Sequence, residues 1–276
     1  MISKITALIA DIDGTLVNKG DDIMPITRNA LEKLHAEGVL IGLSTGRKIN
    51  EHMFKRASDW KLTFPFDVLI GMNGGQLWDK DHEEIESYYL LEPERMKEII
   101  ARMAPLRLNP MIYEKDYMVC TYLDESVRAS MQRNHMETVI TDGDTDRLCI
   151  APNYNVIFRF EEERTEEVAA FAKTLDNENY HGIMTSPGII EFMDPHVNKG
   201  MGLHKYSERN QIPIEEIIAF GDMDNDKEML KEAGWGVCLL NGSDITKANA
   251  DAVTEYSCTE DGMGKYLEKY ILPMYR

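Results

Sequence analysis

The sequence predicts an α/β protein with a doubly wound parallel sheet and an inserted α+β domain. Short apolar runs alternate with amphipathic helical patterns near the start of the chain, and the same alternation returns near its end. The middle has a different pattern, with alternating polar and apolar residues. Strands separated by helices form right-handed crossovers, which produce a parallel sheet covered by helices on both faces.

The alternating pattern predicts a discontinuous core domain formed by residues 1–83 and 190–276. Buried strands are expected in the apolar runs Ile5–Ala10, Val39–Ser44, Val68–Met72, Ile217–Phe220 and Gly236–Leu240. Helices are expected where apolar residues recur at helical spacing, at Thr27–Glu37, Asn50–Lys61, Lys199–Asn210 and Asp226–Ala233. This order of elements is Rossmann-like.

Residues 84–189 are expected to form the inserted domain. Polar and apolar residues alternate at Tyr117–Tyr122 and Asn155–Phe160, which is typical of antiparallel strands. The polar stretch Glu161–Glu167 is typical of a solvated helix start. We therefore expect an α+β domain with an antiparallel sheet.

Composition limits the classes of partner. The 276-residue chain has a formal net charge of −18, which disfavours binding to nucleic acid and to anionic membranes. An anionic small-molecule substrate would need local positive charge. The four cysteines form no CxxC pair, which argues against zinc and disulfides and fits a cytoplasmic protein. The first apolar run is too short for a signal peptide, and we expect a monomer or small homo-oligomer.

The strongest chemical signal is the segment Asp11–Leu16, DIDGTL, directly after an apolar strand. In open parallel sheets, ligands bind beyond the carboxyl ends of the strands. There, Asp11 can act as a nucleophile toward phosphorus, and Asp13 can serve as general acid and base. Gly14 permits a sharp turn. Taken alone, two acids before a glycine are equally well explained as a turn cap.

Two further segments supply groups that bind anions. The run STGR at Ser44–Arg47 follows a predicted strand, so that Thr45 offers a hydroxyl and Gly46 a backbone N–H to a phosphate oxygen. Ser44 is a weaker candidate. Lys199 begins a predicted helix, where a cation is unfavourable against the helix dipole unless it faces an anion.

The last segment, GDMDND at Gly221–Asp226, is rich in oxygen ligands. Mg²⁺ prefers such ligands and needs only a few carboxylates. We expect Asp222 to be a metal ligand, Asn225 to contact phosphate and Asp226 to support the metal. The spacing does not fit a calcium loop of the EF-hand type.

In this order, the four segments resemble those of the haloacid dehalogenase-like (HAD) superfamily, and most closely its Cof-type phosphatases. The resemblance covers about the first 80 and the last 85 residues, whereas the middle corresponds to the variable cap domain of that group. It implies that Asp11 and Asp13 are catalytic, and that Mg²⁺ binds at Asp11, the Asp13 carbonyl, Asp222 and Asp226. The residues implied to hold the phosphoryl group are Thr45, Gly46, Lys199 and Asn225.

The expected function is therefore Mg²⁺-dependent hydrolysis of small phosphomonoesters, such as sugar phosphates or phosphorylated cofactors, through an aspartyl-phosphate. A phosphotransferase or phosphomutase would need the same residues but would exclude water. A non-catalytic sensor of a phosphorylated ligand is a third alternative, although a binding protein would not need Asp13. The sequence does not identify the leaving group.

Overall fold

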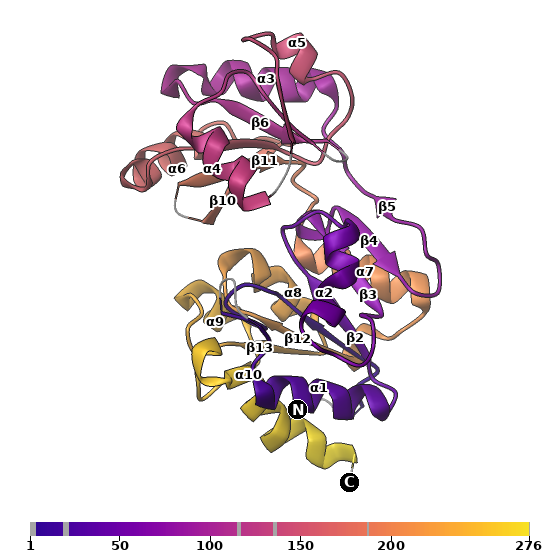
Figure 1. Ribbon diagram of the computed structural model, residues 1–276. Helices are drawn as coiled ribbons and strands as arrows, with labels where there is room; N and C mark the ends of the chain where they lie inside the picture. The colour runs from indigo at the N-terminus through magenta and orange to yellow at the C-terminus, as the bar shows by residue number, and fades with distance from the viewer. Residues whose placement is uncertain (1–3, 19–21, 115–116, 135–136, 187, 276) are drawn as a thin grey trace. The chain divides into compact units, whose positions relative to one another are not determined.

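The computed structural model describes residues 4–18, 22–114, 117–134, 137–186 and 188–275. The chain divides into two compact units, one formed by Met1–Tyr88 and Val197–Arg276 and the other by Tyr89–His196 (Figure 1). Each unit has its own sheet and its own hydrophobic core. The boundaries between the two units lie a few residues further along the chain than the boundaries expected from the sequence.

Within the described residues, the first unit has one sheet with the strand order β14-β13-β12-β1-β2-β3-β4-β5. The pairs from β14 to β3 are parallel, and the pairs β3–β4 and β4–β5 are antiparallel. The strands are β1 (Ala7–Ala10), β2 (Leu40–Ser44), β3 (Val68–Gly71), β4 (Gln76–Asp79), β5 (Glu86–Ser87), β12 (Ile217–Gly221), β13 (Trp235–Cys238) and β14 (Ala252–Val253).

Helices cover both faces of this sheet. One face packs its apolar side chains against α1, α2 and α10, and the other packs against α7 and α8. The helices are α1 (Pro25–Ala36), α2 (Glu51–Asp59), α7 (Lys199–Asn210), α8 (Lys227–Glu232), α9 (Asp244–Asn249) and α10 (Gly262–Tyr266). The predicted α/β class with a parallel-sheet core is confirmed.

Local sequence explains where the principal helices begin. Pro25 stands at the start of α1, where its missing N–H has no hydrogen bond to lose. The side chain of Asn198 accepts a hydrogen bond from the Met201 N–H at 2.8 Å and so caps α7. Before α8, residues Asp224–Asp226 form a 3₁₀ turn, so that the predicted helix over Asp226–Ala233 begins with a tighter first turn.

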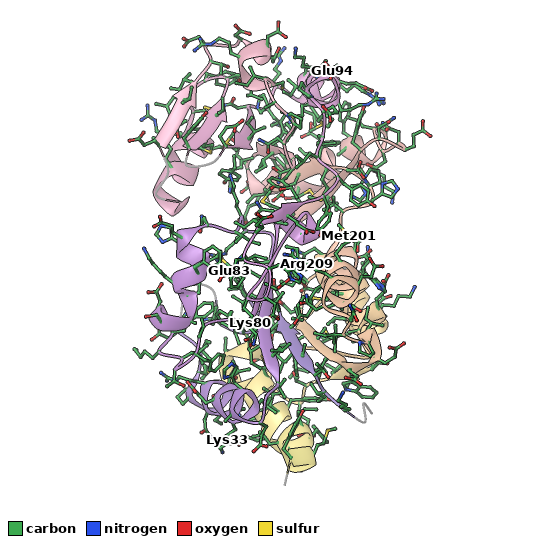
Figure 2. The ribbon with its side chains drawn as sticks, turned by 90° about the vertical axis from the view of Figure 1, so that its right-hand side faces the viewer. Lys33, Lys80, Glu83, Glu94, Met201 and Arg209 are labelled. Atoms are coloured by element: carbon green, nitrogen blue, oxygen red, sulfur yellow. The ribbon has the colours of Figure 1, made fainter. Side chains whose placement is uncertain are left out.

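The antiparallel strands β4 and β5 were not expected from the sequence. Contacts with α7 hold β4 on the sheet. The guanidinium Nε of Arg209 lies 3.2 Å from Oδ2 of Asp79, and Asn210 donates to the same oxygen at 3.1 Å. Lys80 donates to Asp67 at 2.8 Å (both basic side chains are labelled in Figure 2). Arg209 and Asn210 lie about 130 residues from Asp79 in the sequence, and therefore no local pattern predicts these contacts.

In the second unit, the sheet of the described residues has the order β10-β11-β9-β6-β7-β8 and is antiparallel except for β7–β8. Helices α3 and α6 pack on one face and α4 on the other. The strands are β6 (Pro110–Tyr113), β7 (Tyr117–Cys120), β8 (Glu137–Ile140), β9 (Val156–Arg159), β10 (His181–Ser186) and β11 (Ile189–Met193). The helices are α3 (Pro93–Met103), α4 (Glu125–Asn134), α5 (Thr145–Leu148) and α6 (Thr165–Lys173).

Among the described residues, no helix is both long and apolar enough to cross a membrane.

Candidate active site

The predicted site residues gather at one edge of the first unit's sheet. Asp11 directly follows β1, Thr45 follows β2 and Asp222 follows β12. Strand β1 lies between β12 and β2, and the strand order reverses at this point. The carboxyl ends of strands at such a reversal form the crevice in which open α/β sheets bind ligands. Lys199 reaches the same place from the first turn of α7.

Lys199 is fully buried, and its ammonium group binds two carboxylates. Its Nζ donates to Oδ1 of Asp11 at 2.5 Å and also to Oδ1 of Asp226. A buried charge is tolerated only when it is paired and hydrogen-bonded. The unfavourable position of this lysine at a helix start is thus explained by the two anions that it faces.

Asp222 and Asp226 are held by separate sets of donors. Oδ1 of Asp222 accepts a hydrogen bond from the Thr15 hydroxyl at 2.6 Å. Oδ2 of Asp226 accepts from the backbone N–H groups of Asp222 and Met223 at 2.9 and 3.0 Å. Asp226 therefore fixes the loop after β12 as well as contacting Lys199.

The electrostatics of this cluster are unusual. Burial raises the pKa of Asp11 from 3.8 to about 7. Attraction to Lys199 lowers this pKa, and repulsion from Asp226 and Asp222 raises it. Burial also raises the pKa of Asp222 to about 6, although the hydrogen bond from Thr15 opposes this rise. Burial alone would lower the pKa of Lys199, but the two carboxylates beside it raise that pKa, so the ammonium group stays charged.

These residues fit a divalent cation. Asp11, Asp222 and Asp226 each offer a carboxylate oxygen within 4.8 Å of the others. Carboxylate oxygens are ligands that Mg²⁺ prefers. Lys199 supplies a single positive charge beside these three carboxylates, which leaves an excess of negative charge when all three are ionised. A bound cation would remove that imbalance.

Asp13 lies apart from this cluster of three carboxylates. Its Oδ2 accepts hydrogen bonds from Nη2 and Nε of Arg47, at 2.5 and 3.2 Å. Its Oδ1 accepts no hydrogen bond from the described residues. One oxygen of Asp13 is thus anchored by Arg47, and this contact orients the side chain.

The predicted phosphate-binding residues other than Lys199 lie on two turns. The hydroxyl of Thr45 accepts a hydrogen bond from the Arg47 N–H at 3.2 Å. Asn225 donates through Nδ2 to Oδ1 of Asn73 at 3.0 Å. The Asn73 amide lies against Gly46, since a β-carbon on Gly46 would be 3.2 Å from the Asn73 oxygen. Asn73 therefore stands between the two turns.

Sequence reasoning assigned no role to several residues at this site. Asn241 donates through Nδ2 to the carbonyl of Gly14 at 2.8 Å and lies 3.5 Å from Oδ2 of Asp222. Its own carbonyl oxygen accepts from the backbone N–H of Cys258 at 2.8 Å. Arg47 and Thr15 belong to motifs that were recognised, but Asn241 has no signal in the sequence because its partners are remote.

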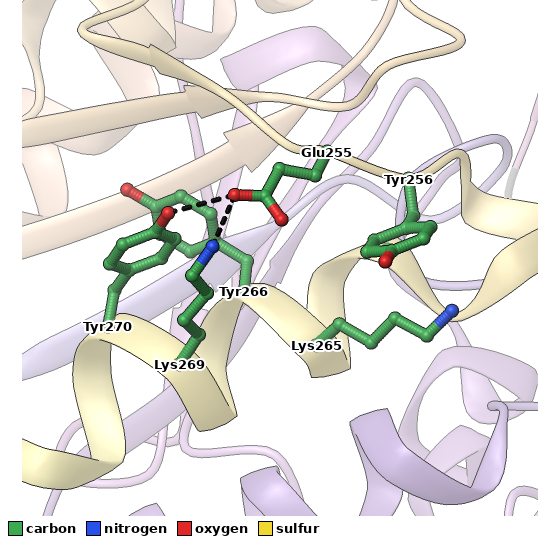
Figure 3. Close-up of a pocket in the computed structure, with 7 residues that line it drawn as sticks. Glu255, Tyr256, Lys265, Tyr266, Lys269 and Tyr270 are labelled. Carbon is green, nitrogen blue, oxygen red and sulfur yellow. Dashed lines mark hydrogen bonds and ion pairs between the residues drawn. The ribbon is translucent and has the colours of Figure 1, made fainter.

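A separate hollow lies near the end of the chain (Figure 3). Glu255 accepts hydrogen bonds from Lys269 and from the Tyr270 hydroxyl there. The ammonium group of Lys265 lies 3.8 Å from the centre of the Tyr256 ring. The residues that line this hollow include none of the predicted site residues, and the charge of Lys269 is already paired.

Comparison with known proteins identifies the family. The model of the haloacid dehalogenase-like hydrolases matches residues 8–267. The chain belongs to this HAD-like hydrolase family. The match includes the four motifs and the segment between them, and it confirms the resemblance that the motifs indicated.

The HAD-like relatives are named as phosphatases or hydrolases, and the solved structures among them share the fold of this chain. The 5-amino-6-(5-phospho-D-ribitylamino)uracil phosphatase YitU of Bacillus subtilis is 28% identical over 98% of this chain and 99% of its own length. The structure of a HAD subclass IIB sugar phosphatase is 26% identical, with a TM-score of 0.78 over 96% of this chain and 98% of its own. A HAD-like hydrolase from Bacteroides thetaiotaomicron is 23% identical, with a TM-score of 0.80 over 96% and 99%. These relatives support the predicted enzyme class, a phosphoric monoester hydrolase.

Proposed function

We propose that this HAD-like hydrolase is a Mg²⁺-dependent phosphatase that cleaves small phosphomonoesters through an aspartyl-phosphate on Asp11. The observation that carries the proposal is the buried contact between Lys199 and Asp11 beside the carboxylates of Asp222 and Asp226. A buried cationic side chain beside the nucleophile, together with carboxylates that can hold a metal ion, suits phosphoryl transfer, because this reaction depends on positioning and charge neutralisation.

Each side chain has a proposed task. Thr45, Gly46, Lys199 and Asn225 would hold the phosphoryl group. Asp11, the Asp13 carbonyl, Asp222 and Asp226 would hold Mg²⁺. When bound, the cation would neutralise charge on the phosphoryl oxygens and on the carboxylates.

The chemistry would proceed in two steps. A carboxylate oxygen of Asp11 forms a bond to phosphorus while the ester O–P bond breaks, and Asp13 gives its proton to the leaving oxygen. Water then attacks the phosphorus of the aspartyl-phosphate and gives a proton to Asp13, while the bond between phosphorus and the Asp11 oxygen breaks. This releases inorganic phosphate and restores the Asp11 carboxylate and the protonated Asp13. The Asp13 oxygen that accepts no hydrogen bond is the atom to which we assign the proton.

The proposed substrates are sugar phosphates or phosphorylated cofactors. YitU is named for a phosphorylated ribityl compound, and the structural relative is named a sugar phosphatase. Both names describe a phosphate ester of a polyhydroxylated carbon chain. A small anionic substrate of this kind is compatible with an acidic protein, because it needs positive charge only where it binds.

The test is phosphate release from a panel of sugar phosphates, nucleotides and phosphorylated cofactors, with Mg²⁺ and with EDTA. We expect release that requires Mg²⁺ and proceeds without an added acceptor. Release only when an acceptor alcohol is present would favour the phosphotransferase alternative. Ligand-induced stabilisation without turnover of any compound would favour the sensor.

A further inference from the structure

The turn after β3 has an unusual backbone. Met72, Asn73 and Gly74 have φ values of 48°, 54° and 105°, in the left-handed region. Residues other than glycine seldom adopt this conformation, although asparagine tolerates it better than most. Such a conformation persists only where the surrounding contacts impose it, and it is often found at functional sites. Asn73 is also buried, with 3% of its surface exposed.

Backbone contacts of this turn join two of the motif segments. The Asn73 N–H donates to the carbonyl of Thr45 at 3.0 Å, and the Met72 N–H donates to that of Arg47 at 3.0 Å. Gly74 packs against the start of α7, since a β-carbon there would lie 2.2 Å from the Asn198 carbonyl oxygen. The turn is thus fixed against both the loop after β2 and the start of the helix that carries Lys199.

The Asn73 side chain reaches a third segment. Its Oδ1 accepts the hydrogen bond from Nδ2 of Asn225, and the two asparagines lie 152 residues apart in the sequence. An asparagine amide has two N–H donors. When Asn73 holds one of them, the orientation of the amide is set and the second donor keeps a fixed direction. Without this partner, the half-exposed Asn225 side chain would lose rotamer freedom on binding a ligand, and binding would weaken.

We infer that Asn73 is a positioning residue that orients the Asn225 amide toward the phosphoryl group and ties the Thr45–Gly46 turn to the Asn225 turn. The inference rests on the proposed function, because it assumes that Asn225 contacts phosphate. Asn73 acts through Asn225 and does not itself touch the substrate. Its loss should therefore weaken phosphate binding without affecting the site that holds the cation.

The experiment is a double-mutant cycle with Asn73→Gly and Asn225→Ala. Glycine adopts the left-handed backbone without strain, so this substitution removes the side chain alone. The readout is the inhibition constant of inorganic phosphate in the presence of Mg²⁺, together with KM. We expect Asn73→Gly to weaken phosphate binding about tenfold, as for one lost hydrogen bond. The double variant should bind no more weakly than Asn225→Ala, because the two residues act as one.

Two controls separate positioning from loss of structure. Asn210→Ala removes another structural amide of the same unit and should change the melting temperature but not phosphate binding. The Mg²⁺ concentration for half-maximal activity should be the same in Asn73→Gly as in wild type. If Asn73→Gly proves too unstable to assay, Asn73→Ser carries the same expectation, because its hydroxyl is too short to reach Asn225.

The outcomes are distinct. Additive effects of the two substitutions, or unchanged phosphate binding in Asn73→Gly, would overturn the inference while wild type remains an active phosphatase. A wild-type protein that releases no phosphate from any compound would instead overturn the proposed function, and the inference with it.

Discussion

The Nζ atom of Lys199 lies 2.5 Å from Oδ1 of Asp11, across 188 residues of sequence, in a site where the lysine is fully buried. The same ammonium group binds Asp226. The ammonium group of Lys199 therefore links the loop after β1, the start of α7 and the turn before α8. We therefore expect Lys199 to contribute both to the stability of the folded protein and to the charge balance of the site.

Replacing Lys199 with Met should impair both folding and activity. Removing one partner of a buried ion pair leaves the other charge uncompensated, at a cost of about 3–5 kcal/mol. We expect a lower melting temperature and a loss of activity of at least a hundredfold, measured by thermal unfolding and by phosphate release. The matched control is Lys205→Met, because Lys205 lies on the same helix and is partly exposed. Equal effects of the two substitutions would contradict a special role for Lys199.

Asp11→Asn should abolish turnover while the fold remains intact. The amide cannot serve as the nucleophile, and we expect kcat/KM to fall by at least about a thousandfold. Since burial raises the pKa of Asp11 to about 7, the ionised carboxylate destabilises the metal-free protein above that pH. The melting temperature of metal-free Asp11→Asn at about pH 8 should thus equal or exceed that of wild type. A variant with wild-type activity would rule out the mechanism.

Mg²⁺ should stabilise the protein more at alkaline pH than at acid pH. The folded-state pKa values of Asp11 and Asp222, about 7 and about 6, lie above the ordinary value of 3.8. Stability from their protonated forms is complete below the ordinary pKa and is lost as pH rises through the folded values. Mg²⁺ competes with these protons. Melting temperatures with Mg²⁺ and with EDTA should differ more at about pH 8 than at about pH 5.5, and a pH-independent difference would contradict this account.

Asn241→Ala should weaken the metal site selectively. Asn241 binds the Gly14 carbonyl and lies beside Asp222. Loss of a residue that orients metal ligands typically costs 10–100-fold in metal affinity. We expect the Mg²⁺ concentration for half-maximal activity to rise about tenfold, with little change in KM for the substrate. Asn249→Ala is the control and should behave as wild type, because Asn249 is partly exposed and its amide donates within α9 to the Ile245 carbonyl.

Much of the first unit could be predicted because its signals are local. The buried strands appear as short apolar runs, and the helix over Lys199–Asn210 has the predicted bounds because Asn198 caps it. Three of the four motifs follow strands that are adjacent in the sheet, and the fourth begins α7, so that the topology brings them together. The predicted catalytic, phosphate-binding and metal-binding roles of these residues remain predictions.

Other features depend on contacts between distant residues. Strand β4 contacts α7, more than 100 residues later, through Asp79, Arg209 and Asn210, and β5 contacts the same helix through Glu86. The hydrogen bonds of Asn73 and Asn241 likewise join remote segments and leave no periodic pattern. The predicted domain boundaries, after residues 83 and 189, remain predictions, and the compact units meet at 88/89 and 196/197.

The most direct test of the central claim is to trap the phosphoryl group on Asp11. Wild-type protein and the Asp13→Asn variant would be mixed with Mg²⁺ and the best substrate, quenched in acid and digested for mass spectrometry. We predict one added phosphoryl group on the peptide that contains Asp11, with more accumulating in Asp13→Asn because water attack lacks its base. Turnover that leaves Asp11 unmodified in both proteins, or a phosphoryl group on another residue, would contradict the account.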